Sequence, residues 1–171
     1  MYRIGDIMAK YNKLIITSLG VLLIDMLSKV LIKHFILLGI RIKIIKGFLY
    51  ITYVKNTGAA FSIFRNNTLF LIILSIVIIG LLFYYLSKKI YLSKLENISY
   101  GLILGGAIGN LFDRIIYGYV IDFIDIYIFK FDYPVFNIAD MAIVIGVIIL
   151  IIDLFRGEKN GDKSRKRVKN R

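Results

Sequence analysis

The stretch GGAIGNLFDRIIYG, Gly105 to Gly118, ends a hydrophobic run that is long enough to cross a membrane, yet it carries an amide, a carboxylate and a guanidinium. Each ionisable residue inside a membrane helix costs about 2.5–3.5 kcal/mol, so such residues are expected to pair, to face the protein interior and to mark a functional site. Asn110 lies three residues before Asp113 and four before Arg114, so all three can reach one site near the end of a helix. The spacing allows Arg114 either a structural pair with Asp113 or a contact with a substrate.

Glycines recur every four residues on the same helix, at Gly101, Gly105 and Gly109. Small residues at this spacing let a neighbouring helix approach closely. We therefore predict that another helix packs against this face.

The composition indicates that the chain lies in lipid. Its 171 residues are 58% hydrophobic, against about 45–50% for a soluble domain. Four runs approach the roughly 20 apolar residues that span a bilayer; they are residues 14–35, 69–86, 98–116 and 138–155. We predict a mainly α membrane protein with four transmembrane helices in one domain, residues 1–155. The first run is too long for a cleaved signal sequence and is read as a retained anchor.

The charges predict the orientation of the chain. Four spans place both termini on one side, and Lys and Arg in the N-terminal segment, the second loop and the tail make that side cytoplasmic. The tail, residues 156–171, is expected to be disordered. The first outer loop is a counter-signal, because it carries Lys33, Arg41, Lys43, Lys46, Lys55 and Arg65. The even number of spans, the basic tail and the basic second loop outweigh this counter-signal. We therefore attribute the net charge of +12 to membrane topology, and we do not expect nucleic-acid binding.

The two outer loops have the pattern of strands. IRIKI, Ile40 to Ile44, alternates apolar and basic residues, and FLYITYV continues as a β-branched and aromatic run. The second loop, YGYVIDFIDIYIFKFDYP, is also rich in such residues. We predict a small extracytoplasmic β-sheet platform with a short helix or loop, its basic face directed towards lipid phosphates.

Several chemistries are excluded by composition. The chain has no cysteine, so thiolate catalysis, thiolate metal ligands and disulfides are ruled out. His34 is the single histidine, which argues against a histidine-based zinc site.

Asp25 and Lys29 lie four residues apart in the first apolar run, within DMLSK. They share a helix face and can form an ion pair. The spacing alone leaves open whether the pair only joins helices or supports a site.

Asp122 in VIDF and Asp140 in FNIAD are predicted to lie at the outer membrane boundary. Two carboxylates brought together in an apolar setting cannot both ionise, which is the chemistry of an aspartic protease. Asn137 is a plausible N-cap with Asp140 at the third helical position, and the helix dipole would favour negative charge on Asp140. We therefore expect Asp122 to hold the shared proton. Nothing in the spacing requires the two to meet, and capping alone would also explain Asn137.

Two other carboxylates and a turn of small residues have simpler interpretations. Asp125 and Asp132 are expected to be solvated. Asn56 in KNTGAAFSIF offers a polar group that can bond a peptide, and Gly58 and its small neighbours let another backbone approach. A plain turn is an equally good reading of this segment.

Five motifs together resemble the lipoprotein signal peptidase family, also called signal peptidase II. They are DMLSK, NTGAAFS, GGAIGNLFDR, VIDF and FNIAD, and they follow the family's order from Asp25 to about Ala142. The resemblance implies a membrane aspartyl endopeptidase that removes the signal peptide from a prolipoprotein, just before a cysteine that carries diacylglycerol. It implies general acid–base attack of water without metal or cofactor.

The resemblance also implies roles for individual residues. Asp122 and Asp140 would be the catalytic pair. Asn56, Asn110, Arg114 and Asn137 match polar residues that line the substrate site, and Asp25, Lys29 and Asp113 match supporting residues. The strand region from Ile40 to Val54 would form a platform and a mobile cover. Met141 departs from the family, which often has a small polar residue there, so a hydroxyl contact at this position is in doubt.

Two further interpretations remain open from sequence. Intramembrane acids and bases also serve proton-coupled transporters, although no inverted repeat is visible and the key carboxylates lie at one face. A membrane scaffold without activity would leave the outer Asn and Asp residues without a purpose. The family implies lipidated prolipoproteins as partners, contact with membrane lipids and a monomeric enzyme in the bacterial cytoplasmic membrane.

Overall fold

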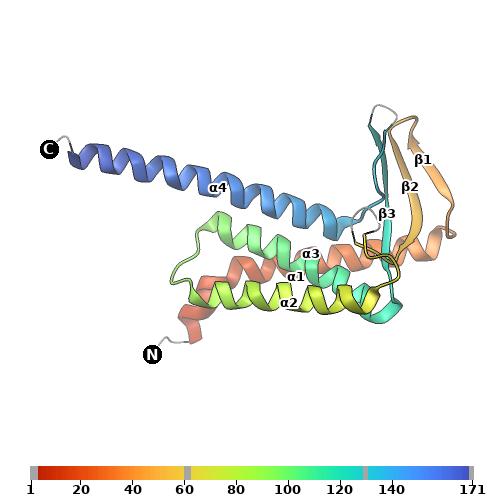
Figure 1. The fold of residues 1–171 in the computed structure, drawn as a ribbon, viewed down its shortest axis with the longest axis horizontal. Helices are drawn as coiled ribbons and strands as arrows, with labels where there is room; N and C mark the ends of the chain where they lie inside the picture. Colours follow the sequence, from red (N-terminus) through yellow and green to blue (C-terminus); the bar gives the residue numbers. More distant parts are fainter. Residues whose placement is uncertain (1–3, 60–62, 129–130, 170–171) are drawn as a thin grey trace.

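The computed structural model describes residues 4–59, 63–128 and 131–169. Its helices are α1 (Ile4–Phe35), α2 (Thr68–Lys88), α3 (Lys94–Tyr117) and α4 (Ile138–Lys169), and its strands are β1 (Arg41–Ile45), β2 (Leu49–Asn56), β3 (Val120–Ile128) and β4 (Phe131–Asp132). Figure 1 shows the helices running alongside one another, with the sheet at one end and both chain ends at the other. The helices therefore alternate in direction.

Three helices of the described chain are long and apolar enough to cross a membrane. They comprise Lys10–Phe35, Thr68–Lys88 and Ile138–Phe155, with mean hydropathies of 2.1, 2.8 and 2.7. Their Leu, Ile, Val and Phe side chains are largely exposed, as expected for surfaces that face lipid. The protein is thus a mainly helical membrane protein with a small antiparallel sheet.

Helix α3 packs against each of α1, α2 and α4, and it buries several polar side chains, among them Asn97, Asn110 and Asp113. It begins with a capping box, in which Ser93 and Glu96 satisfy each other's backbone N–H groups, and it ends at Gly118 in the left-handed conformation (φ 78°). The predicted span 98–116 lies within α3. The crossing of the bilayer by α3 as a fourth span stays a prediction.

The glycines of α3 allow the close packing that the sequence predicts. A Cβ on Gly101 or Gly105 would lie 2.7 or 2.6 Å from a backbone oxygen of α1, and a Cβ on Gly106 would lie 2.4 Å from the Ala139 oxygen of α4. A Cβ on Gly109 would lie 2.6 Å from an Asp25 carboxylate oxygen. The predicted close contact of another helix with these glycines is confirmed for α1, and α4 also approaches α3 closely, at Gly106.

The sheet has the order β1-β2-β3-β4, and all its pairings are antiparallel. The register pairs Val54 with Asp122 and Lys55 with Ile121. Because successive strand residues point to opposite faces, Asp122 and Ile121 lie on different faces of the sheet. The predicted strands at Ile40–Val54 and in the second loop are confirmed.

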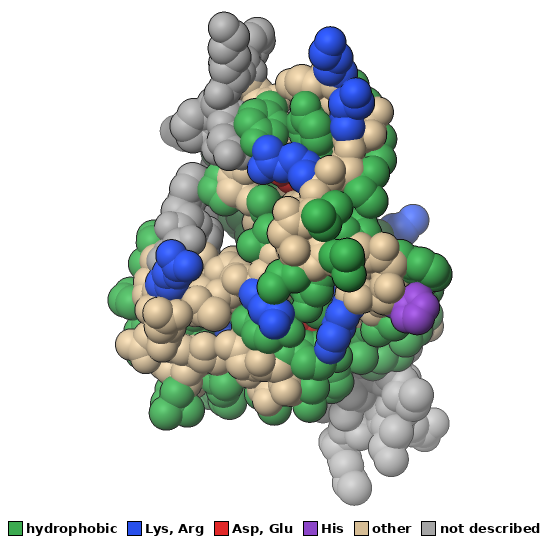
Figure 2. Space-filling model, turned by 90° about the vertical axis from the view of Figure 1, so that its right-hand side faces the viewer, with side chains coloured by type: hydrophobic (Ala, Val, Ile, Leu, Met, Phe, Trp, Pro, Cys, Tyr) green, Lys and Arg blue, Asp and Glu red, His purple; other side chains and the backbone are tan. Residues whose placement is uncertain are grey.

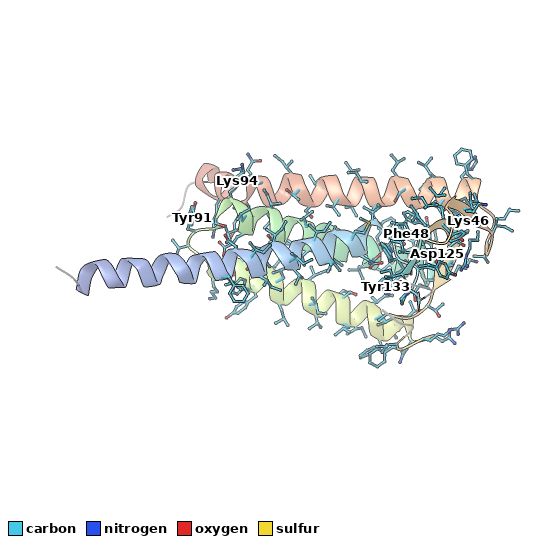
Figure 3. The ribbon with its side chains drawn as sticks, turned by 90° about the horizontal axis from the view of Figure 1, so that it is seen from above. Lys46, Phe48, Tyr91, Lys94, Asp125 and Tyr133 are labelled. Carbon is cyan, nitrogen blue, oxygen red and sulfur yellow. The ribbon has the colours of Figure 1, made fainter. Side chains whose placement is uncertain are left out.

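One prediction outside the site, that Asp125 is solvated, is corrected. The Asp125 side chain is completely buried and pairs with Arg41, whose Nε lies 2.7 Å from Oδ2; its burial follows from the approach of β1, which only the folded sheet provides. Figure 3 shows Asp125 among the crowded side chains of the sheet end. Helix α4 extends to Lys169. The expected disorder of residues 156–171 stays a prediction. The side chain of Asp132 lies outside the described part.

Candidate active site

Asp140 lies in the first turn of α4, where Asn137 begins the helix. The Asp140 N–H donates to Asn137 Oδ1 at 3.0 Å, and the Asn137 N–H donates to Asp140 Oδ2 at 3.2 Å. These reciprocal bonds satisfy two backbone donors that a helix start leaves free. The predicted cap is confirmed, and it fixes the Asp140 carboxylate at the helix terminus.

The same Asn137 also reaches Asp122, the second candidate carboxylate. Its Nδ2 donates to Asp122 Oδ1 at 2.7 Å and to Asn110 Oδ1 at 3.1 Å. Asn137 is completely buried, and Asp122 is 2% exposed. One side chain therefore joins the strand that carries Asp122 to the helix that carries Asp140.

Two more amides complete the contacts of the carboxylates. Asn56 Nδ2 donates to Asp122 Oδ2 at 2.8 Å, and Asn110 Nδ2 donates to Asp140 Oδ1 at 2.7 Å. All four carboxylate oxygens therefore accept an N–H, and the neutral donors hold both groups without neutralising them. Asn56 Oδ1 in turn accepts from the Gly58 N–H at 2.9 Å, which fixes the turn after β2.

Behind these residues lies a buried ion cluster centred on Lys29. Its Nζ lies 2.7 Å from Asp25 Oδ2 and 3.0 Å from Asp113 Oδ2, and it donates to Asn110 Oδ1 at 3.1 Å. Asp25 Oδ1 accepts from the backbone N–H of Ala139 at 2.9 Å. The cluster thus holds Asn110 and the start of α4 from behind.

Arg114 does not pair with Asp113, its neighbour in sequence. It donates through Nη2 to the Gly58 carbonyl at 3.0 Å and through Nη1 to the Asn110 carbonyl at 3.3 Å. Asp113 points away, towards Lys29 and the Ile121 N–H. The structural Asp113–Arg114 pair is therefore not formed, because consecutive helix residues do not face each other.

A cavity of about 490 Å³ opens in front of the two carboxylates. Asp122, Asp140, Asn56, Asn110 and Arg114 contribute to its lining. The rest of the wall comes from the end of β2 and its turn (residues 54–59), Val120 of β3, the segment 133–136, Arg65, and apolar residues of α4. Tyr133, one of the lining residues, lies at the sheet end of the bundle in Figure 3, far from Tyr91 and Lys94 at the other end. The site is therefore polar on one side and apolar on the other.

The environment of Asp122 changes its acidity. Burial raises the pKa of the Asp122 carboxyl to about 7, and the negative charge of Asp140 acts in the same direction. The hydrogen bonds from Asn56 and Asn137 lower this pKa but do not offset the burial. Asp122 can therefore hold a proton near neutral pH, as a general acid must.

The comparisons with known proteins agree with this geometry. The family described as signal peptidase (SPase) II matches residues 17–156. The chain belongs to the signal peptidase II family. It is therefore an enzyme, an aspartic-type lipoprotein signal peptidase by family.

Solved structures share the fold. One, described as a bacterial membrane enzyme determined in meso at 2.3 Å resolution, has a TM-score of 0.79 and 35% identity, and the match covers 93% of each chain. Another with the same description at 1.9 Å has a TM-score of 0.75 and 36% identity, over 90% of this chain and 94% of that one.

The structure brings together all the site residues that the resemblance to signal peptidase II implies, together with Gly58, which was singled out for its small size. Asn56, Gly58, Asn110, Arg114, Asp122 and Asp140 line the cavity, Asn137 joins the carboxylates, and Asp25, Lys29 and Asp113 lie behind them.

Sequence reasoning missed the Ala139 N–H, which bonds Asp25, and the cavity positions of Arg65 and Tyr133. A backbone donor carries no sequence signal, and the two side chains lie in loops without a motif. Met141 is 40% exposed, and the described cavity lining does not include it.

Proposed function

We propose that the protein removes the signal peptide from diacylglyceryl-modified prolipoproteins, cutting just before the lipidated cysteine. The observation that carries the proposal is the Asn137 bridge, which holds Asp122 and Asp140 together at one cavity in a chain of the signal peptidase II family. A carboxylate pair of this kind can supply both the base and the acid of peptide hydrolysis.

The two carboxylates take different roles in the proposed reaction. Asp140, at the positive end of the α4 dipole, is ionised and removes a proton from the attacking water. Asp122 is protonated and donates to the carbonyl oxygen as the C–O bond forms. Asp140 then protonates the leaving nitrogen as the C–N bond breaks, and Asp122 recovers its proton when the carbonyl reforms. Protons and atoms balance without metal or covalent intermediate.

The other site residues hold the substrate or the pair. Asn56 and Arg114 lie at the cavity where a peptide backbone would pass, and the Gly58 turn is kept open for it by its bonds to both. Asn110 and Asn137 orient the carboxylates, while Lys29, Asp25 and Asp113 fix Asn110 from behind. Asn110, Asn137, Lys29, Asp25 and Asp113 are thus positioning residues, whereas Asn56 and Arg114 would contact the peptide.

The proposed location is supported by the same geometry. We propose that α3 is the fourth span, that both termini are cytoplasmic and that the sheet and the site lie at the outer face of the bacterial cytoplasmic membrane. Both chain ends lie at the end of the bundle opposite the sheet (Figure 1), which supports this orientation. The acyl chains of the substrate would remain in the bilayer, so the site is entered sideways between helices by a monomeric enzyme.

The proposal is tested with two precursors of identical sequence, one with diacylglyceryl on the cysteine and one without. Purified protein in neutral detergent is expected to release the signal peptide only from the lipidated precursor, with the new N-terminus at the modified cysteine in the mass spectrum. Equal cleavage of both precursors, or cleavage elsewhere, would refute the assigned substrate.

A further inference from the structure

The sheet has a second face that the proposed reaction does not use. Asn56 bonds Asp122 on one face, whereas Lys55 and Ile121 are paired in register on the other. Tyr53 and Tyr119 share that other face by strand alternation, and their hydroxyls lie 3.3 Å apart. This face packs against the end of α1. Lys55 is the one member of this face that also borders the cavity, at its edge along β2.

Two lysines and two tyrosines form a cluster on this second face, which we call the lysine–tyrosine cluster. Lys33 Nζ lies 4.2 Å from the ring centre of Tyr117, and Lys55 Nζ lies 4.9 Å from that of Tyr119. The two rings stack with their centres 6.0 Å apart. Contact with a ring face restrains a flexible lysine side chain, so less entropy is lost when its ammonium binds a ligand.

No carboxylate whose side chain the structure describes compensates the charge of the cluster. Within residues 4–59, 63–128 and 131–169, neither Lys33 nor Lys55 forms a salt bridge, and both are exposed. The described carboxylates of this end are Asp25, Asp113, Asp122, Asp125 and Asp140, and none of them is exposed. Figure 2, which looks onto the sheet end, shows Lys and Arg side chains across the face with only traces of acidic ones. An anionic partner is therefore favoured.

The depth of the cluster identifies that partner. Lys33 lies in the last turn of the apolar helix α1, and Tyr117 is the last residue of α3. Exposed apolar side chains precede both, including Leu31 at 47% and Ile115 at 57%. Cations and tyrosines at the end of apolar helices lie at the level of lipid headgroups, with the apolar side chains at the level of the acyl chains.

We propose that the lysine–tyrosine cluster binds the phosphate of an anionic phospholipid headgroup in the outer leaflet. Lys33 and Lys55 supply the positive charge, and the exposed apolar residues of α1 and α3 contact the acyl chains. The lipid secures the rear of the sheet whose other face carries Asp122. The placement in the outer leaflet rests on the proposed orientation, whereas headgroup binding is measured without peptidase activity. Because Lys55 also borders the cavity, the single variant Lys33→Gln, whose lysine does not, separates failure of this site from failure of the proposed function.

The test is a titration of delipidated protein with phosphatidylglycerol, followed by native mass spectrometry, with phosphatidylcholine as the neutral reference. Wild type is expected to prefer phosphatidylglycerol, and the Lys33→Gln/Lys55→Gln variant to bind it about 30-fold more weakly, roughly fivefold for each lysine. The matched control, Lys43→Gln/Lys46→Gln, removes two exposed lysines of the β1 region that have no place in the cluster, and it should bind as wild type does.

Two further measurements test a single variant and a soluble competitor. Lys33→Gln alone, a change at an exposed position, should weaken binding about fivefold even if the double variant folds poorly. Glycerol 3-phosphate should not displace the lipid, because it lacks acyl chains. An equal loss of phosphatidylglycerol binding in both double variants would indicate an effect of diffuse surface charge. Unchanged binding in both would show that the cluster is not a lipid site. Displacement by glycerol 3-phosphate would show that the ligand is a soluble phosphate, and each of these three results overturns the proposal.

Discussion

Replacing Lys29 by methionine removes a charge from the centre of the buried cluster and keeps a stem of similar length. The Lys29 side chain is 2% exposed, and its ammonium lies 2.7 Å from one Asp25 oxygen and 3.0 Å from one Asp113 oxygen. The substitution therefore leaves two buried carboxylates near each other without their common cation. It also removes the donor to Asn110 Oδ1.

The loss can be bounded from general measurements. Breaking a buried ion pair by removing one partner costs about 3–5 kcal/mol, which is a large share of a total stability of about 5–15 kcal/mol. Lys29→Met should therefore fold but with much lower stability. Activity should fall by up to about 100-fold as well, because Asn110 is no longer fixed against Asp140.

Reversible denaturation in mixed detergent micelles measures this stability, with circular dichroism as the signal because the chain has no tryptophan. Lys43→Met is the matched control, since Lys43 is exposed and a surface change stays within about 0.5 kcal/mol. Adding Asp113→Asn to Lys29→Met should restore part of the loss. If Lys29→Met were as stable as Lys43→Met, the reasoning about the buried cluster would be refuted.

Three further predictions concern acidity and packing. The rate kcat/KM should fall as the pH rises through about 7, because Asp122 must keep its proton to act as an acid and its pKa is raised to about 7; a pH profile without a basic limb there would contradict this. Asn56→Leu removes a hydrogen bond that lowers this pKa, so the basic limb should move to higher pH in the same assay, and an unchanged or lower limb would count against the assignment. Gly106→Ala should cost about 1–3 kcal/mol in denaturation, because its Cβ would lie 2.4 Å from the Ala139 oxygen, whereas at Gly20 an added Cβ meets nothing within 4 Å; equal stabilities of the two alanine variants would contradict the packing.

The sequence was informative where a local rule applies. The spacing of Asp25 and Lys29 correctly predicts their ion pair, because residues four apart share a helix face. The Asn137–Asp140 cap could also be predicted, because it depends on neighbouring residues and helix geometry. The glycine repeat of α3 indicated close packing for the same reason.

The remaining contacts join distant parts of the chain, and no local rule gives them. Lys29 and Asn110 are 81 residues apart, and their bond decides which way the Asn110 amide points. Asp125 was expected to be solvated because nothing nearby in sequence shows that Arg41 would pair with it. Asp113 pairs with Lys29 and not with Arg114, and this pairing likewise depends on how α1 and α3 pack.

The central claim is that Asp122 and Asp140 act as one catalytic pair. The most direct measurement is cleavage of a diacylglyceryl-modified prolipoprotein by wild type, Asp122→Asn, Asp140→Asn and the control Asp153→Asn, whose carboxylate bonds Ser93 away from the cavity. Both site variants should insert and fold yet fail to cut, since neither carboxylate can perform both proton transfers, while Asp153→Asn should cut as wild type does. Normal cleavage by either site variant would contradict the account.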